Sequence, residues 1–230
     1  MLTPLVMLPG LICDSALWRF QIEEMADVAA VTVADLTLDD SVKAMAVRTL
    51  AVAPAQFALA AMSMGGYVAF EIMRQAPERV TRLALFSTSA APDSPEKVKA
   101  RQGAIASVRL GQFRGATERL LPSLVARRHI GDSVAEIVKD MAVRVGANAF
   151  LTQQQAILGR PDSRAVLSTI KVPTLVAVGD CDVLTPPSDV EDIHRGIAGS
   201  RFHIFRECGH LPALECPDET TRLLRDWLSS

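Results

Sequence analysis

The sequence predicts an α/β protein with a mostly parallel central sheet of about six strands, flanked by helices. Two observations support this prediction. Short apolar runs bounded by turn residues recur along the chain, and segments with helical spacing lie between them. Strands that are apolar along their whole length are typical of parallel sheets, which are buried on both faces. Since strand and helix alternate, we expect helices on both sides of one sheet.

The expected strands are short and evenly distributed over most of the chain. They cover residues 4–8, 30–34, 57–62, 82–87, 174–178 and 201–205. The segments between them repeat apolar residues at helical spacing, which predicts helices over residues 15–27, 41–52, 64–75, 187–197 and 218–227.

The alternation of strand and helix stops between residues 91 and 169. Helical segments follow one another there, without a convincing strand. From residue 95 to 168 the chain carries 12 Lys and Arg against 6 Asp and Glu, a net charge of +6 against −8 for the remainder. We therefore expect a core formed by residues 1–90 and 170–230, with a basic helical insertion over residues 91–169.

Composition limits the other classes of protein. The chain has 230 residues, 49% of them apolar, which suits one domain with an insertion. A net charge of −2 without a basic tract argues against nucleic-acid binding. No apolar run approaches the roughly 20 residues of a membrane span, and the apolar start is broken by prolines and lacks the basic residues of a signal peptide. We expect a cytoplasmic protein without membrane attachment.

The most informative residue is Ser63, within Ala61-Met62-Ser63-Met64-Gly65-Gly66, where an apolar run ends and a helical segment begins. A serine hydroxyl is a weak nucleophile at neutral pH, so an enzyme that uses one exposes it on a sharp turn beside a base and amide donors. The chain supplies candidate partners in Asp182, within Gly-Asp-Cys-Asp-Val-Leu-Thr-Pro-Pro, and in His210, within Cys-Gly-His-Leu-Pro.

The order of serine, aspartate and histidine, together with the Leu-Pro-Gly-Leu segment at residues 8–11 and Trp18, resembles the α/β-hydrolase superfamily over nearly the full chain. One departure is Ala61, where the usual nucleophile elbow has glycine; alanine is the smallest replacement. The resemblance implies that the insertion forms a helical cap over the active site.

The resemblance also assigns roles to individual residues. Ser63 would be the nucleophile, His210 the base, and Asp182 the carboxylate that orients the imidazole. The backbone amides of Leu11 and Met64 would form the oxyanion hole. No cofactor and no metal is implied. Asp180 is the rival of Asp182, although the spacing to Thr-Pro favours Asp182.

Several residues near the site have less defined roles. The four cysteines at positions 13, 181, 208 and 216 show no metal or disulfide spacing, and we expect incidental packing. The charge of the cap indicates solvated helix faces or, alternatively, arginines that bind a substrate carboxylate. The candidates for that role are Arg101, Arg109, Arg127 and Arg128.

The favoured function is a serine hydrolase that cleaves a carboxylic ester, thioester or lactone of a small to medium molecule. One alternative keeps the same triad but acts as a C–C bond hydrolase or as a lyase or synthase on menaquinone-type precursors carrying a carboxylate. A second alternative is a small-molecule receptor with vestigial activity. With only two aromatics in the cap, Phe113 and Phe150, we expect an aliphatic pocket and a preference for short acyl groups. The sequence does not determine the oligomeric state.

Overall fold

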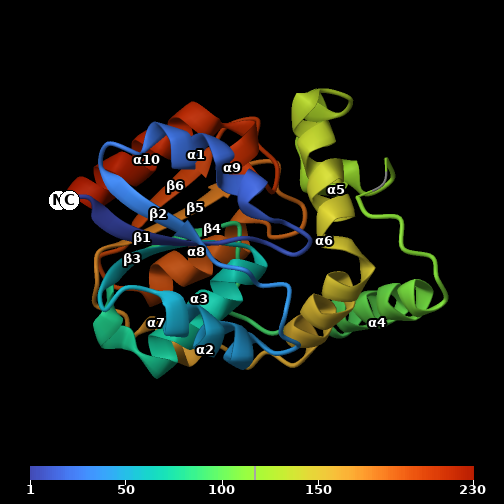
Figure 1. Ribbon diagram of the computed structural model, residues 1–230, viewed down its shortest axis with the longest axis horizontal. Coiled ribbons are helices and arrows are strands. Elements are labelled where there is room, and N and C mark those ends of the chain that lie inside the picture. Colours follow the sequence, from blue (N-terminus) through green and yellow to red (C-terminus); the bar gives the residue numbers. More distant parts are fainter. Residues whose placement is uncertain (117) are drawn as a thin grey trace.

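The computed structural model describes residues 1–116 and 118–230, and these form a six-stranded parallel sheet with the strand order β2-β1-β3-β4-β5-β6 (Figure 1). The predicted α/β class and the number of strands are confirmed. The strands are β1 (Thr3–Leu8), β2 (Ala29–Val33), β3 (Phe57–Met62), β4 (Val80–Phe86), β5 (Thr174–Gly179) and β6 (Arg201–Phe205).

Burial explains why these segments form strands in this order. Every residue of β3 and β5 is buried, as expected for interior strands covered on both faces. The edge strands β2 and β6 have one fully buried residue each, and their other residues are exposed or half-buried, so they face solvent on part of their surface. The register aligns the ends of neighbouring strands, with Leu8 beside Ala61 and Met62 beside Phe86.

Helices cover both faces of the sheet (Figure 1). One face packs against α2, α3 and α8, whose apolar residues share one core cluster with the strands. The other face packs against the first helical segments and the C-terminal helices, which share a second cluster. The helices of the first face are α2 (Val42–Val52), α3 (Met64–Gln75) and α8 (Pro187–Gly196); those of the second are η1 (Ser15–Trp18), α1 (Arg19–Glu24), α9 (Pro212–Glu215) and α10 (Pro217–Ser229), and the short η2 (Pro77–Arg79) precedes β4.

Helix bounds agree with the sequence pattern except at one place. The single helix expected over residues 15–27 is a 3₁₀ turn followed by a short α-helix that ends at Glu24. Asp14 caps the 3₁₀ turn by accepting a hydrogen bond from the N–H of Ala16.

Between β4 and β5 every element in the described part of the chain is helical. These elements are α4 (Pro95–Arg109), α5 (Leu121–Leu124), η3 (Arg127–His129), α6 (Ser133–Leu158) and α7 (Arg164–Leu167). Helices α4, α5 and α6 stand to one side of the sheet and its two helical layers (Figure 1). Residue 117, which falls within the expected cap over residues 91–169, lies outside the described residues.

The longest of these helices is interrupted. Gly146 has φ 76° and ψ 178° inside α6, a conformation that breaks the helix into two parts. Helix α7 contacts α3 and α8, so the end of the insertion packs on the core. Among the described residues, no helix is both long and apolar enough to cross a membrane.

Candidate active site

The carboxyl ends of the parallel strands place the candidate site residues at one edge of the sheet. Ser63 follows β3, Asp182 follows β5, and His210 follows β6. Leu11 follows β1, which is paired directly with β3. Loops at this edge of an open α/β sheet meet in space although they are far apart in the sequence.

Ser63 lies on a strained turn between β3 and α3. Its φ of 52° and ψ of −115° are unusual for a residue with a side chain, and its N–H donates to the carbonyl oxygen of Phe86 at 3.0 Å. The turn is crowded immediately after the serine. A Cβ at Gly65 would come within 2.6 Å of the Leu8 carbonyl oxygen, and one at Gly66 within 2.3 Å of Thr88 Oγ1.

Alanine at the first position of the elbow is accommodated inside the sheet. Ala61 is fully buried inside β3, and the two positions that exclude a side chain both carry glycine. Thr88 also fastens the turn, because its hydroxyl donates to the Ser63 carbonyl oxygen at 2.8 Å.

The structure brings the three predicted triad side chains into one hydrogen-bonded series. Nε2 of His210 lies 2.9 Å from Oγ of Ser63, and Nδ1 of His210 lies 2.8 Å from Oδ2 of Asp182. Asp182 is 3% exposed and His210 4% exposed, whereas Ser63 is half-buried. A buried carboxylate and imidazole that meet a more accessible hydroxyl have the geometry required to activate a serine nucleophile.

Asp182 and Asp180 have different partners. The second carboxylate oxygen of Asp182 accepts hydrogen bonds from the N–H groups of Leu184 and Thr185, both at 2.9 Å. Asp180 accepts from the N–H of Cys208 at 3.2 Å and does not reach the imidazole. Burial raises the pKa of Asp180, but hydrogen bonds from the Cys181 thiol and from backbone N–H groups outweigh it and hold that pKa below its usual value.

Glu215 supports the loop that carries His210. Its buried carboxylate accepts from the N–H groups of Gly209 and Leu211, both at 2.9 Å, and from that of Ala126 at 2.7 Å. Ala126 belongs to the segment between β4 and β5, so one carboxylate joins the histidine loop to that segment. The N–H of His210 also donates to the carbonyl oxygen of Leu124 at 3.2 Å.

The first loop lies beside the nucleophile. A Cβ built at Gly10 would lie 3.5 Å from the Cβ of Ser63, an ordinary contact distance. Among the described residues, no backbone carbonyl accepts a hydrogen bond from the N–H of Leu11 or of Met64. The N–H of Ile12, by contrast, donates to the side chain of Gln153 at 2.9 Å.

Backbone strain gathers at this edge of the sheet. Four described residues other than glycine have a positive φ, and each follows a strand: Ile12 after β1, Ser63 after β3, Ser87 after β4 and Glu207 after β6. A positive φ costs about 1–3 kcal/mol for such residues and is found chiefly at functional sites. The strain therefore marks the same edge as the triad.

The cysteines near the site differ in environment. Burial raises the pKa of the Cys13 thiol to about 12. The thiols of Cys208 and Cys216 hydrogen-bond to each other, which raises the pKa of the buried Cys208 and lowers that of the half-buried Cys216. Cys181 is exposed, and its hydrogen bond to Asp180 raises its pKa.

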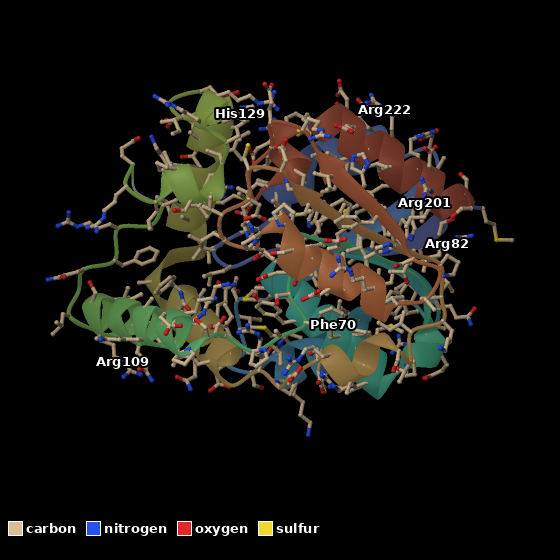
Figure 2. The ribbon with its side chains drawn as sticks, turned by 180° about the vertical axis from the view of Figure 1, so that it is seen from behind. Phe70, Arg82, Arg109, His129, Arg201 and Arg222 are labelled. Atoms are coloured by element: carbon tan, nitrogen blue, oxygen red, sulfur yellow. The ribbon has the colours of Figure 1, made fainter. Side chains whose placement is uncertain are left out.

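The arginines proposed for a substrate carboxylate have other partners or face solvent. Arg101 pairs with Asp93 and donates to Gln154 Oε1 at 2.9 Å. Arg128 donates to the carbonyl oxygen of Glu215 at 3.5 Å. Arg109 and Arg127 are exposed, and Arg109 lies on the helical insertion on the side away from the sheet (Figure 2).

Two interactions of the insertion were not expected from the sequence. Asp93 is buried between Arg101 and Arg160, with Arg160 Nη2 at 2.9 Å, and the Arg160 guanidinium lies 4.2 Å from the centre of the Tyr67 ring. The second feature is Gln153, which is fully buried and bonds Ile12 and Leu36. Neither feature has a local sequence signal, because each depends on a partner more than 20 residues away.

The fold and the bonded serine, histidine and aspartate define a serine hydrolase of the α/β type. Residues 29–217 match the profile of the serine aminopeptidase family. The chain belongs to this family of α/β-hydrolases. The predicted resemblance is thereby confirmed.

Several relatives of this chain are esterases. The chain is 30% identical over 175 residues to the pimeloyl-[acyl-carrier protein] methyl ester esterase of Neisseria meningitidis serogroup C, covering 72% of this chain and 67% of that protein. The enzyme of the same description from Nitrosomonas europaea is 25% identical, over 94% of this chain and 91% of its own length.

Solved structures agree with these relatives. A thermophilic esterase from Thermogutta terrifontis superposes with a TM-score of 0.88 at 29% identity, covering 99% of this chain and 89% of that one. An enol-lactonase from Burkholderia xenovorans, 21% identical, has the same fold, also with a TM-score of 0.88 over 100% of this chain and 92% of that one. The chain is accordingly a serine hydrolase with esterase activity, as predicted, and the C–C hydrolase, lyase and receptor alternatives are not favoured.

Proposed function

We propose that the protein hydrolyses a carboxylic ester of a small to medium aliphatic molecule through an acyl-enzyme on Ser63. The observation that carries this proposal is the hydrogen-bonded series from Ser63 Oγ through His210 to Asp182, at 2.9 and 2.8 Å. Each member of the series comes from a different loop, and each loop is held by backbone hydrogen bonds.

In the first half-reaction, Ser63 Oγ attacks the ester carbonyl carbon while His210 Nε2 takes the hydroxyl proton. The imidazolium then gives that proton to the departing alkoxide, which leaves as an alcohol. Asp182 holds Nδ1 and stabilises the imidazolium without taking its proton. In the second half-reaction, His210 removes a proton from water, and the water oxygen attacks the carbonyl carbon of the acyl-enzyme. The imidazolium returns that proton to Ser63 Oγ as the bond to the acyl group breaks, which releases the carboxylic acid.

The developing oxyanion needs donors that are already oriented. We assign this role to the N–H groups of Leu11 and Met64. Met64 is the first residue of α3, where backbone N–H groups have no partner within the helix and the helix dipole favours negative charge. All the groups in this mechanism belong to the protein, so the proposed reaction uses no cofactor and no metal.

We propose that residues 91–169 form the cap and set the size of the substrate. The hydrogen bond from His210 N–H to Leu124 and the bond from Ala126 N–H to Glu215 place this segment directly against the histidine loop. Its two aromatic side chains, Phe113 and Phe150, pack on each other with ring centres 5.7 Å apart. An aliphatic acyl group of modest length suits such a cap.

The names of the relatives indicate which kind of ester the enzyme cleaves. Those proteins act on the methyl ester of an acyl group, and we infer a small alcohol as the leaving group here as well. We place the enzyme in the cytoplasm, because the four cysteines are free thiols, a state that a reducing compartment maintains.

The experiment combines active-site labelling with an ester series. A fluorophosphonate probe is expected to modify Ser63 in the folded wild type and to leave Ser63→Ala unmodified. p-Nitrophenyl acetate and butyrate are expected to give higher kcat/KM than the palmitate ester. Absence of an adduct at Ser63 in folded protein would remove the proposed mechanism, and a preference for palmitate would contradict the proposed pocket.

A further inference from the structure

Gln153 connects the cap to the first loop of the core. It lies on α6 and is fully buried. Its Oε1 accepts a hydrogen bond from the N–H of Ile12 at 2.9 Å, and its Nε2 donates to the carbonyl oxygen of Leu36 at 3.1 Å. Both ends of one cap amide are therefore bonded to the core backbone, more than 100 residues away in the sequence.

The partner of Gln153 is the residue that follows the candidate oxyanion donor. The N–H groups of Leu11 and Ile12 belong to adjacent peptide units, so fixing one restricts the orientation of the other. The N–H of Cys13 donates to the carbonyl oxygen of Gly10 at 3.2 Å and closes a turn around both. Among the described residues, the N–H groups of Ile12 and Cys13 in this turn have acceptors, whereas the N–H of Leu11 has none.

The loop needs external support because its backbone is strained. Ile12 has a φ of 52°, in the left-handed region that favours glycine and that a β-branched residue rarely enters. Such a conformation persists only where surrounding contacts hold it. The bond from Ile12 to a buried side chain of the cap supplies one of these contacts.

We propose that Gln153 is a positioning residue for ester hydrolysis, which orients the Leu11 amide toward the substrate carbonyl oxygen by holding the peptide unit next to it. This inference rests on the proposed function, since it needs an oxyanion at Ser63. The core would then supply the donors of the oxyanion hole, and the cap would orient one of them. Substrate binding depends on the cap surface, whereas the orientation of the Leu11 N–H depends on the side-chain amide of Gln153.

The test compares two neighbouring glutamines. Gln153→Met keeps a side chain of similar length but removes the acceptor for Ile12 N–H. Gln154→Met is the matched control, because Gln154 is also buried on α6 and bonds Arg101 within the cap rather than the first loop. Kinetics are measured with p-nitrophenyl butyrate, and the rate of fluorophosphonate labelling at Ser63 is measured for the same variants.

For Gln153→Met we expect kcat to fall about 10–100-fold with KM within about threefold. A misplaced N–H donor weakens the hydrogen bond to the oxyanion, which forms mainly in the transition state. The labelling rate should fall by a similar factor, since the phosphonyl oxygen needs the same donors. For Gln154→Met both quantities should stay within about threefold of wild type. Circular dichroism and thermal melting check that both variants are folded.

Gln153→Glu keeps an oxygen that can accept from Ile12 N–H and serves if the methionine variant does not fold. Its kcat should lie below that of wild type but above that of Gln153→Met, again with little change in KM. The proposal is overturned if a folded Gln153 variant keeps wild-type kcat, if it raises KM alone, or if Gln154→Met loses as much kcat. A wild type that fails to label at Ser63 would instead overturn the proposed function.

Discussion

The loops at the carboxyl edge of the sheet and the helical insertion contribute to the same site by different means. The loops are fixed by short-range crowding. A Cβ at Gly179 would come within 2.2 Å of the carbonyl oxygens of Cys208 and Gly209, so the aspartate and histidine loops lie in direct contact. The insertion shares apolar clusters with the core, and polar side chains such as Gln153 add hydrogen bonds between the two.

The two regions therefore differ in role: the loops carry the proposed reacting groups, and the insertion supports these loops. Backbone packing at the sheet edge holds Ser63, Asp182 and His210 in place, and a change there would alter the proposed reacting groups themselves. In the insertion, Gln153 bonds the core backbone at Ile12 and Leu36. Asp93 pairs with Arg101 and with Arg160, whose guanidinium lies over the Tyr67 ring. We therefore expect changes in the loops to affect the rate strongly, and changes in the insertion to affect stability or orientation more moderately.

The largest effect is expected at one of the two aspartates in the loop after β5. Asp182→Asn should lower kcat about 10⁴-fold, because an amide at this position no longer favours the productive imidazole tautomer. Asp180→Asn is the matched change two residues away, and its loss should be below about tenfold, since Asp180 braces the N–H of Cys208 and does not reach the imidazole. Steady-state kinetics of both purified variants measure the difference. Equal losses would show that Asp182 has no special part in the reaction.

An intermediate effect is expected at the buried ion cluster of the insertion. Asp93 lies between Arg101 and Arg160, and Asp93→Asn should lower the free energy of unfolding by about 2 kcal/mol at pH 7. Burial raises the pKa of Asp93, but the two guanidinium groups outweigh it, and the net pKa is lowered. The stabilisation is therefore complete above the ordinary carboxyl pKa of about 4 and is lost as the pH falls through the lower value of the folded state.

Urea unfolding at pH 7 and at pH 3 measures this prediction. The difference between wild type and Asp93→Asn should be smaller at pH 3 than at pH 7. Asp39→Asn is the control, because the Asp39 pair with Arg48 lies at the surface and is screened by solvent. A loss from Asp39→Asn as large as that from Asp93→Asn would contradict a special role for the buried cluster.

The smallest effect concerns the thiols beside the histidine loop. Iodoacetamide at pH 7 should modify Cys216 faster than Cys208 or Cys13, because the pKa of Cys216 is lowered while burial protects the other two. Peptide mass spectrometry after timed quenching gives the three rates. Faster modification of Cys208 would show that the loop opens more readily than its packing indicates.

Much of this molecule could be predicted from the sequence because the informative signals are local. The structure has the expected bounds for the strands at residues 57–62 and 201–205 and for the helix at residues 64–75. Apolar runs and helical periodicity can be recognised there because they involve consecutive residues. The proximity of Ser63, Asp182 and His210 followed from their order and from the parallel sheet. The family match confirms the class of fold and enzyme from which their roles were inferred.

What the sequence did not indicate depends on distant contacts. Gln153 is one of several glutamines in a helical run, and only the folded chain shows that it meets Ile12. The break at Gly146 was missed because an isolated glycine is also tolerated within a continuous helix. The four candidate arginines had equal standing in the sequence, whereas the structure pairs Arg101 with Asp93 and exposes Arg109 and Arg127.

The left-handed backbone at Ile12 also bears on how such an enzyme adapts to heat. Glycine would adopt this conformation without steric cost, so selection for thermal tolerance alone would favour it there. The same replacement would give the loop more freedom, in a place where freedom weakens stabilisation of the reaction. Thermal stability and the rate of the proposed reaction thus place opposite demands on this single position.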